Sequence, residues 1–162
     1  IPDDREDYIQ ISGRQNNERK NKFIKAKYIK EHENLKKWKV FVPKANGTGA
    51  IGEVLSTPLI GEPLIGHTQT YISIGKFDTQ LEAENCMKYI KSKFARAMLG
   101  ILKITQDNPA PKWKKVPLQD FTPTSDIDWT KSIPEIDQQL YAKYGLSQDE
   151  IAFIEEKVKV MA

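Results

Sequence analysis

Three four-residue segments of the form Ser/Thr-x-x-Glu mark helix starts along the chain. They are Thr79-Gln80-Leu81-Glu82, Ser132-Ile133-Pro134-Glu135 and Ser147-Gln148-Asp149-Glu150. In such a capping box the hydroxyl accepts a hydrogen bond from the fourth backbone N–H and the glutamate accepts one from the first, so donors that the helix leaves unpaired are satisfied. Because all three segments lie beyond residue 78, we expect helices in the later part of the chain and strands before them.

The residues after each capping box support this division. Gly145 separates the second helix from the third, with Leu146 and Ile151 placed as a hydrophobic staple. Residues 121–162 are therefore expected to form a C-terminal helical appendage to a domain of residues 1–120. After Thr79, apolar residues at helical spacing predict one long helix that packs on a sheet; they are Met87, Ile90, Phe94, Ala97, Met98 and Ile101.

Segments rich in β-branched and aromatic residues predict strands in the first 120 residues. The expected strands cover residues 8–11, 23–29, 39–42 and 70–74, with 113–118 as a candidate last strand. Residues 14–21 hold no apolar side chain and are expected to form an exposed loop, whereas residues 54–66, with two Leu-Ile-Gly copies, are expected to form turns. The predicted class is α+β: a mixed, mostly antiparallel sheet packed on one long helix, with a C-terminal helical hairpin.

Charge is segregated along the chain. Residues 14–44 hold eleven Lys or Arg against three Asp or Glu, whereas residues 120–162 hold four against nine. A basic segment of this kind is suited to a polyanion such as nucleic acid. No apolar run approaches the roughly 18 residues of a membrane span, and the single cysteine, Cys86, favours a reducing cytoplasm. Since Ile1 is not a start methionine, we interpret the chain as part of a longer protein.

A strand that leads directly into a basic, glycine-rich segment is the clearest motif. Lys39-Val40-Phe41-Val42 is followed by Lys44 and by Gly47-Thr48-Gly49-Ala50-Ile51-Gly52, whose backbone amides and lysine are suited to a phosphate. The glycine spacing also matches dinucleotide and kinase loops. Pro58 forbids the helix that a dinucleotide site needs, and the other kinase motifs are missing, so no nucleotide cofactor is expected.

Catalytic patterns are incomplete. Pro2-Asp3 with Glu18-Arg19-Lys20 resembles the metal-binding carboxylates of restriction nucleases, but Glu18 is expected in a loop that cannot position it. Asp107-Asn108-Pro109 lacks the aromatic residue that would stack on a flipped base. His32, His67 and Cys86 do not have metal-ligand spacing. We therefore expect no catalytic residue, no metal and no cofactor within this chain, and a metal-dependent nuclease is the less favoured alternative.

The polar and basic residues of the chain are better suited to the recognition of DNA than to catalysis. Arg, Asn and Gln side chains read base edges and lysines contact phosphates. The expected base-reading residues are Arg14, Asn16, Asn17 and Gln69. The expected phosphate contacts are Lys25, Lys27, Lys39 and Lys44, and the neighbouring Arg19, Lys20 and Lys22 are also available to grip phosphates.

Several segments together resemble the C-terminal target-recognition domain of type II restriction–modification enzymes with an adenine-N6 DNA methyltransferase core. The likeness spans nearly the whole chain. It is carried by residues 11–17, 27–30, 39–49, 89–96, 113–121, 126–129 and 136–141, among them Val42-Pro43-Lys44-Ala45-Asn46-Gly47 and Asp126-Ile127-Asp128-Trp129.

This resemblance implies a domain that holds double-stranded DNA, selects a short sequence and presents an adenine to catalytic domains upstream in the same chain. S-adenosylmethionine, and in some members an endonuclease, would belong to those domains. Lys44, Asn46 and Gly47 match positions of the family motif that would face DNA, and Arg14 matches less closely. The alternative is a protein-docking module without DNA contact, which would use the acidic helices of residues 132–161.

Overall fold

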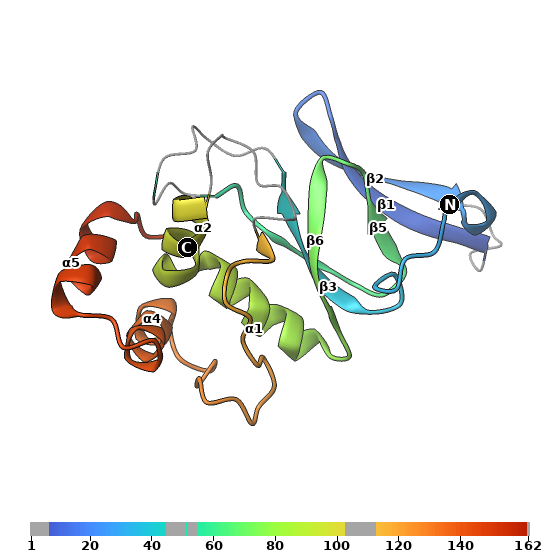
Figure 1. Ribbon diagram of the computed structural model, residues 1–162. Helices are drawn as coiled ribbons and strands as arrows, with labels where there is room; N and C mark the ends of the chain where they lie inside the picture. Colours follow the sequence, from blue (N-terminus) through green and yellow to red (C-terminus); the bar gives the residue numbers. More distant parts are fainter. Residues whose placement is uncertain (1–6, 45–50, 52–54, 103–112, 162) are drawn as a thin grey trace.

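Two small three-stranded sheets lie beside a group of helices (Figure 1). The computed structural model describes residues 7–44, 51, 55–102 and 113–161. The strand orders are β2-β1-β5 and β4-β3-β6, and the pairings are antiparallel except for β1 with β5. The α+β class, the mostly antiparallel pairing and the C-terminal helical pair are confirmed, but the strands form two sheets instead of one.

The first sheet is built on a long hairpin. Strand β1 (Tyr8–Gln15) pairs with β2 (Glu18–Lys25) through a two-residue turn, in which Asn16 and Asn17 have φ of 52° and 62°. Such a turn needs positive φ at both positions, and asparagine tolerates this conformation well. The prediction of a loop over residues 14–21 was therefore wrong, although these residues are exposed as expected. A short 3-10 helix, Ala26–Tyr28, replaces the end of the strand predicted over 23–29.

The second sheet has β3 (Trp38–Pro43) at its centre, between β4 (Leu59–Gly61) and β6 (Tyr71–Phe77). The strands predicted over 39–42 and 70–74 are confirmed as β3 and β6. The segment of residues 54–66, which was predicted to form turns, contains one short strand and the start of another. The first Leu-Ile-Gly copy is β4, and the second continues into β5 (Ile65–His67), so their backbone groups pair with neighbouring strands.

The predicted long helix is two helices. α1 (Gln80–Lys91) ends at Ser92, whose ψ of 151° is extended, and α2 (Lys93–Leu102) starts directly after it. The Ser92 hydroxyl accepts a hydrogen bond from Ala95 N at 3.1 Å, and the carboxylate of Asp137 accepts two from the start of α2, from Lys93 N at 3.1 Å and Phe94 N at 2.9 Å. These acceptors satisfy the N–H groups exposed by the break.

The C-terminal helices are α4 (Ile133–Lys143) and α5 (Gln148–Lys157). All three predicted capping boxes are confirmed, with both reciprocal hydrogen bonds present in each. Gly145 follows α4 with a φ of +62°, a conformation that favours glycine. Residues 113–118 do not form the predicted strand; Trp113 and Val116 instead bury their side chains in the core.

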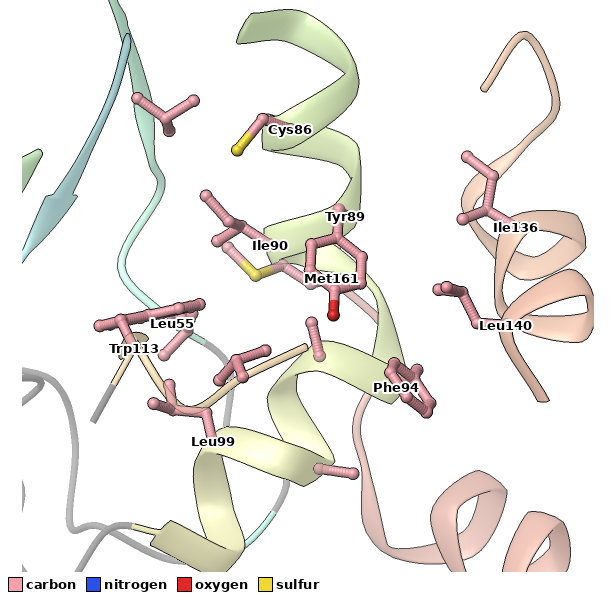
Figure 2. Close-up of a cluster of buried hydrophobic side chains, with 14 of the residues drawn as sticks. Leu55, Cys86, Tyr89, Ile90, Phe94, Leu99, Trp113, Ile136, Leu140 and Met161 are labelled. Atoms are coloured by element: carbon pink, nitrogen blue, oxygen red, sulfur yellow. The ribbon is translucent and has the colours of Figure 1, made fainter. Parts of the chain in front are cut away.

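One hydrophobic cluster extends from the second sheet to the C-terminal helices. It combines Val40 and Val42 of β3 with side chains of α1, α2, α4 and α5. Figure 2 shows its central part, where Tyr89 of α1 and Phe94 of α2 lie with Leu140 of α4. The cluster thus joins the segments 1–120 and 121–162. None of the helices in the described ranges is long and apolar enough to cross a membrane.

The contact between Asp137 and the start of α2 gives a stability prediction. Asp137→Ala leaves two N–H groups of α2 without an acceptor in a buried site, so we expect the free energy of unfolding to fall by about 2–3 kcal/mol. Gln138→Ala, on the exposed side of the same helix, should change it by less than about 0.5 kcal/mol. Urea unfolding of both variants measures the difference, and equal effects would contradict the capping role of Asp137.

Candidate nucleic-acid interface

Strand β2 presents a basic surface to solvent. All eight of its residues are exposed, and it holds Arg19, Lys20, Lys22 and Lys25 against a single acidic residue, Glu18. The strand lies at the edge of its sheet, paired to β1 alone. Lysines on an edge strand discourage pairing with another strand, and they also leave a positive surface available to an anion.

The hairpin has two different faces, because partners directly opposite in a sheet point to the same side. One face carries Lys20 opposite Gly13 and Lys22 opposite Ile11. The other carries Arg19 opposite Arg14. A shallow groove of about 270 Å³ lies along the first face near the turn, and it is lined by Ile11, Gly13, Arg14, Gln15, Lys20, Lys22 and Thr68.

The turn between β5 and β6 packs against this groove. Thr68 N donates a hydrogen bond to Ser12 O at 2.9 Å, and a Cβ atom on Gly13 would lie only 2.8 Å from the Thr68 methyl group. The absence of a side chain at Gly13 therefore permits the close approach. Gln69, the next residue in this turn, is exposed beside the hairpin.

Lys44 lies next to the same turn. Its backbone N–H donates a hydrogen bond to Thr70 O at 2.9 Å, and its side chain is exposed. The fold thus brings Arg14, Lys44 and Gln69, which are far apart in the sequence, to one end of the strands. Figure 1 shows this end at the top, where the hairpin turn and the β5–β6 turn project.

The tip of the hairpin carries free amide groups. Arg14 Nη2 donates to Asn17 O at 3.2 Å and steadies the turn. The exposed side chains of Asn16 and Asn17 make no hydrogen bond within the described residues. Each of these side-chain amides therefore remains available to a ligand as a paired donor and acceptor.

The cations of β2 differ in their partners. Arg19 Nη2 donates to Thr57 O at 2.6 Å and so ties the hairpin to the loop before β4. Lys20 forms an exposed ion pair with Glu18 at 3.2 Å. No acidic group in the described residues pairs with Lys22. Of the two β2 lysines that line the groove, Lys22 is thus the one whose charge is less compensated.

Lys25 and Lys27 lie at the other end of the hairpin. Lys25 is opposite Tyr8, six residue pairs from Arg14 and Arg19, a separation of about 20 Å at strand spacing. Its Nζ lies 5.6 Å from the centroid of the Tyr8 ring. Lys27 is in the 3-10 helix, with Nζ 5.1 Å from the Tyr28 ring centroid. These two lysines therefore do not join the groove.

Lys39 does not lie on the surface, so its assignment as a phosphate contact was wrong. Its side chain is 1% exposed, and Nζ donates to three carbonyl oxygens, of Leu35 at 3.1 Å, Lys37 at 3.1 Å and Glu62 at 2.9 Å. Burial lowers the pKa of Lys39 to about 8. Residues 39–43 of β3 are all buried, so both faces of the strand are covered there.

Several predicted features fall outside the described residues. They are Asn46 and Gly47 with the rest of the glycine-rich segment except Ile51, the Pro2-Asp3 pair, and Asp107-Asn108-Pro109. Glu18, the remaining carboxylate of the nuclease pattern, is exposed on β2. In the described ranges no three His, Cys, Asp or Glu side chains are grouped to hold a metal ion. Cys86 is buried, which raises the pKa of its thiol.

Sequence reasoning missed two parts of this candidate interface. Thr68 was not singled out, because only the tertiary contact with Gly13 brings it to the groove. The hairpin itself was also missed, although the Asn16-Asn17 dipeptide is a recognisable signal for a two-residue turn. Residues 14–21 hold no apolar side chain, so the alternation that predicts strands is absent on both sides of the turn.

No model of a known protein family matches the chain, and neither a curated protein nor a solved structure matches it.

The buried ammonium group of Lys39 predicts a pH dependence. Its pKa is about 8 in the folded protein and about 10.4 in an unfolded chain, so between these values the unfolded state binds more protons. Stability should therefore rise with pH from about 8 to 10, by at most about 1.4 kcal/mol per pH unit. Lys39→Met should remove this rise. Urea unfolding of both proteins at pH 7, 8, 9 and 10 tests it, and parallel profiles would contradict the assignment.

Proposed function

We propose that this chain is a sequence-specific DNA-binding domain, which recognises duplex DNA through the β1–β2 hairpin and the turn beside it. The observation that carries the proposal is the full exposure of β2, with four cations and one anion, beside a groove lined by Arg14, Lys20 and Lys22. An exposed surface of this charge neutralises phosphates, and its polar tip is suited to base edges.

The dimensions of the hairpin suit the major groove. B-form DNA has a major groove about 12 Å wide, which admits a two-stranded ribbon. In this arrangement Asn16 and Asn17 enter with the turn, and their amides pair with adenine edges. Gln69 reads a neighbouring base pair from the β5–β6 turn.

Phosphate contacts come from both sides of the tip. Lys20 and Lys22 line the groove, and Lys44 lies by the β5–β6 turn. Lys25, with Lys27 beyond it, lies about 20 Å away along the ribbon, which corresponds to about six base pairs of duplex. Lys39 takes no part, because it is buried.

The resemblance to target-recognition domains supplies the biological context of the proposal. The domain would select the DNA sequence in the cytoplasm for an adenine-N6 methyltransferase, and in some enzymes an endonuclease, carried by other parts of the same protein. S-adenosylmethionine would bind there. This chain would contribute the specificity and no catalytic group.

Protein docking is a second candidate, favoured by one observation. An apolar groove of about 400 Å³ lies between α2 and α5, with Met98, Ile101 and Phe153 on its walls and Asp149 and Glu150 at its rim. The exposed fractions of Ile101 and Phe153 are 66% and 48%. A catalytic domain of the same protein, with an apolar surface and a basic edge, fits this groove, so docking and DNA binding are compatible.

Salt dependence tests the phosphate contacts. With a random 20-base-pair duplex pool as the probe, Lys22→Gln should weaken binding to all sequences and reduce the slope of log K against log salt by about 0.9. Lys157→Gln, on α5, removes the same charge far from the hairpin and serves as the control. Fluorescence anisotropy between 50 and 200 mM salt measures both. If both variants behave alike, the hairpin face is not the DNA contact.

Selection of bound DNA sequences from a random pool tests whether the tip of the hairpin reads bases. A double variant, Asn16→Gly and Asn17→Gly, keeps a turn with positive φ but removes both amides. We expect the wild-type protein to enrich a short motif from the random pool, and the variant to lose about 1–3 kcal/mol of discrimination at one or two positions while retaining non-specific binding. Sequencing of the enriched pools shows the difference. Enrichment of the same motif to the same degree by both proteins would exclude the tip as the reader.

A further inference from the structure

The end of the hairpin opposite the Asn16–Asn17 turn exposes aromatic rings between lysines. Phe23 is 44% exposed on β2, and Tyr28 is 70% exposed in the 3-10 helix that follows it. Single exposed apolar residues are common on protein surfaces. Here two of them fall within a segment that also contains Lys22, Lys25 and Lys27.

Rings and ammonium groups lie close together at this end. Lys25 is directly opposite Tyr8, and Phe23 is two residues from Lys25 on the same strand, so these three side chains share one face. Lys25 Nζ lies 5.6 Å from the Tyr8 ring centroid. Lys27 Nζ lies 5.1 Å from the ring centroid of Tyr28. Each of these lysines is thus positioned next to an aromatic ring.

We propose that this aromatic–lysine surface, formed by Tyr8, Phe23, Lys25, Lys27 and Tyr28, binds unpaired nucleotides of single-stranded DNA. Bases stack on the exposed rings of Phe23 and Tyr28, while Lys25 and Lys27 contact the adjoining phosphates. Stacking tolerates any sequence, since every base has a flat π face, and the charged groups add a salt-dependent attraction.

A lipid surface fits these observations less well. Insertion into a bilayer interface needs apolar side chains that point in one direction. Phe23 and Ile24 are consecutive residues of a strand, so they point to opposite faces of the ribbon. The face that carries Phe23 also holds the polar Gln10 and Asn21. The pattern of flat rings, amides and lysines is better matched by a nucleic-acid strand.

This site goes beyond the proposed binding of duplex DNA and does not require it. The pair Tyr8–Lys25 is about 20 Å along the ribbon from the pair Arg14–Arg19 at the tip. Substitutions of aromatic residues at one end therefore leave the cations and amides of the other end in place, so each activity can be lost separately.

The experiment measures binding of the whole chain to a fluorescent 20-nucleotide oligothymidylate and to the random duplex pool. Phe23→Leu and Tyr28→Leu keep an apolar side chain but remove the ring. We expect each to weaken oligothymidylate binding by about fivefold or more and to change duplex binding by less than twofold. Tyr28→Phe should restore the affinity. Phe153→Leu, a ring of similar exposure on α5, should have no effect.

A second measurement locates the contact. Oligothymidylate that carries 4-thiothymidine is irradiated in the complex, and crosslinked peptides are identified by mass spectrometry. Crosslinks at Phe23 or Tyr28 support the proposal, and crosslinks confined to other segments overturn it.

Other outcomes are equally decisive. The proposal fails if the wild-type protein does not bind oligothymidylate, if both leucine variants bind it as tightly as the wild type, or if Phe153→Leu weakens binding as much. Binding to phosphatidylserine vesicles without binding to oligothymidylate would assign the surface to lipid instead. Retained oligothymidylate binding without duplex binding would refute the proposed function of the tip and leave this site standing.

Discussion

The structure depends on the burial of strand β3 on both of its faces. Val40 and Val42 point into the hydrophobic cluster with the helices and are not exposed at all. On the opposite face, Phe41 is 1% exposed and its ring meets that of His67 from the first sheet at a centroid distance of 5.1 Å. Because one strand contacts both the helices and the first sheet, it fixes the hairpin relative to the core. The same burial encloses Lys39, whose ammonium group is satisfied by three carbonyl oxygens.

The helices are joined by a polar contact as well as by apolar packing. Asp137 is 2% exposed, and burial raises the pKa of its carboxyl group even though two backbone N–H groups of α2 donate to it. Arg96 of α2 donates to Lys91 O at 3.1 Å and to Lys159 O at 2.6 Å, which connects the end of α1 with the C-terminal segment. Buried polar groups are tolerated when they are hydrogen-bonded, and these bonds connect successive helices.

In contrast to the buried core, the hairpin is exposed along the whole length of β2. The hydrogen bond from Ser12 Oγ to Asn21 Oδ1 at 2.8 Å joins its two strands, and the bond from Arg19 to Thr57 O holds it to the loop before β4, while β2 stays exposed. A ribbon that is anchored by Arg19 near its tip and uncovered along one strand is suited to a large, elongated partner. The two proposed activities, binding of duplex DNA at the tip and of unpaired nucleotides at the opposite end, rely on the same exposure and are separated by the length of the strands.

The sequence by itself determined the local features: the three capping boxes, strands β3 and β6, the α+β class and the exposed, basic character of residues 14–22. These follow from hydrogen bonds and side-chain periodicity within a few residues, which the order of amino acids fixes. Tertiary structure alone decided that Lys39 is buried, that the helix breaks at Ser92, that Thr68 contacts the hairpin and that Lys44 contacts the turn beside it. Each of these depends on a partner distant in sequence, such as the carbonyl of Glu62 or the carboxylate of Asp137. Local patterns cannot reveal such partners, because the free energy of burial and hydrogen bonding is set by the whole fold.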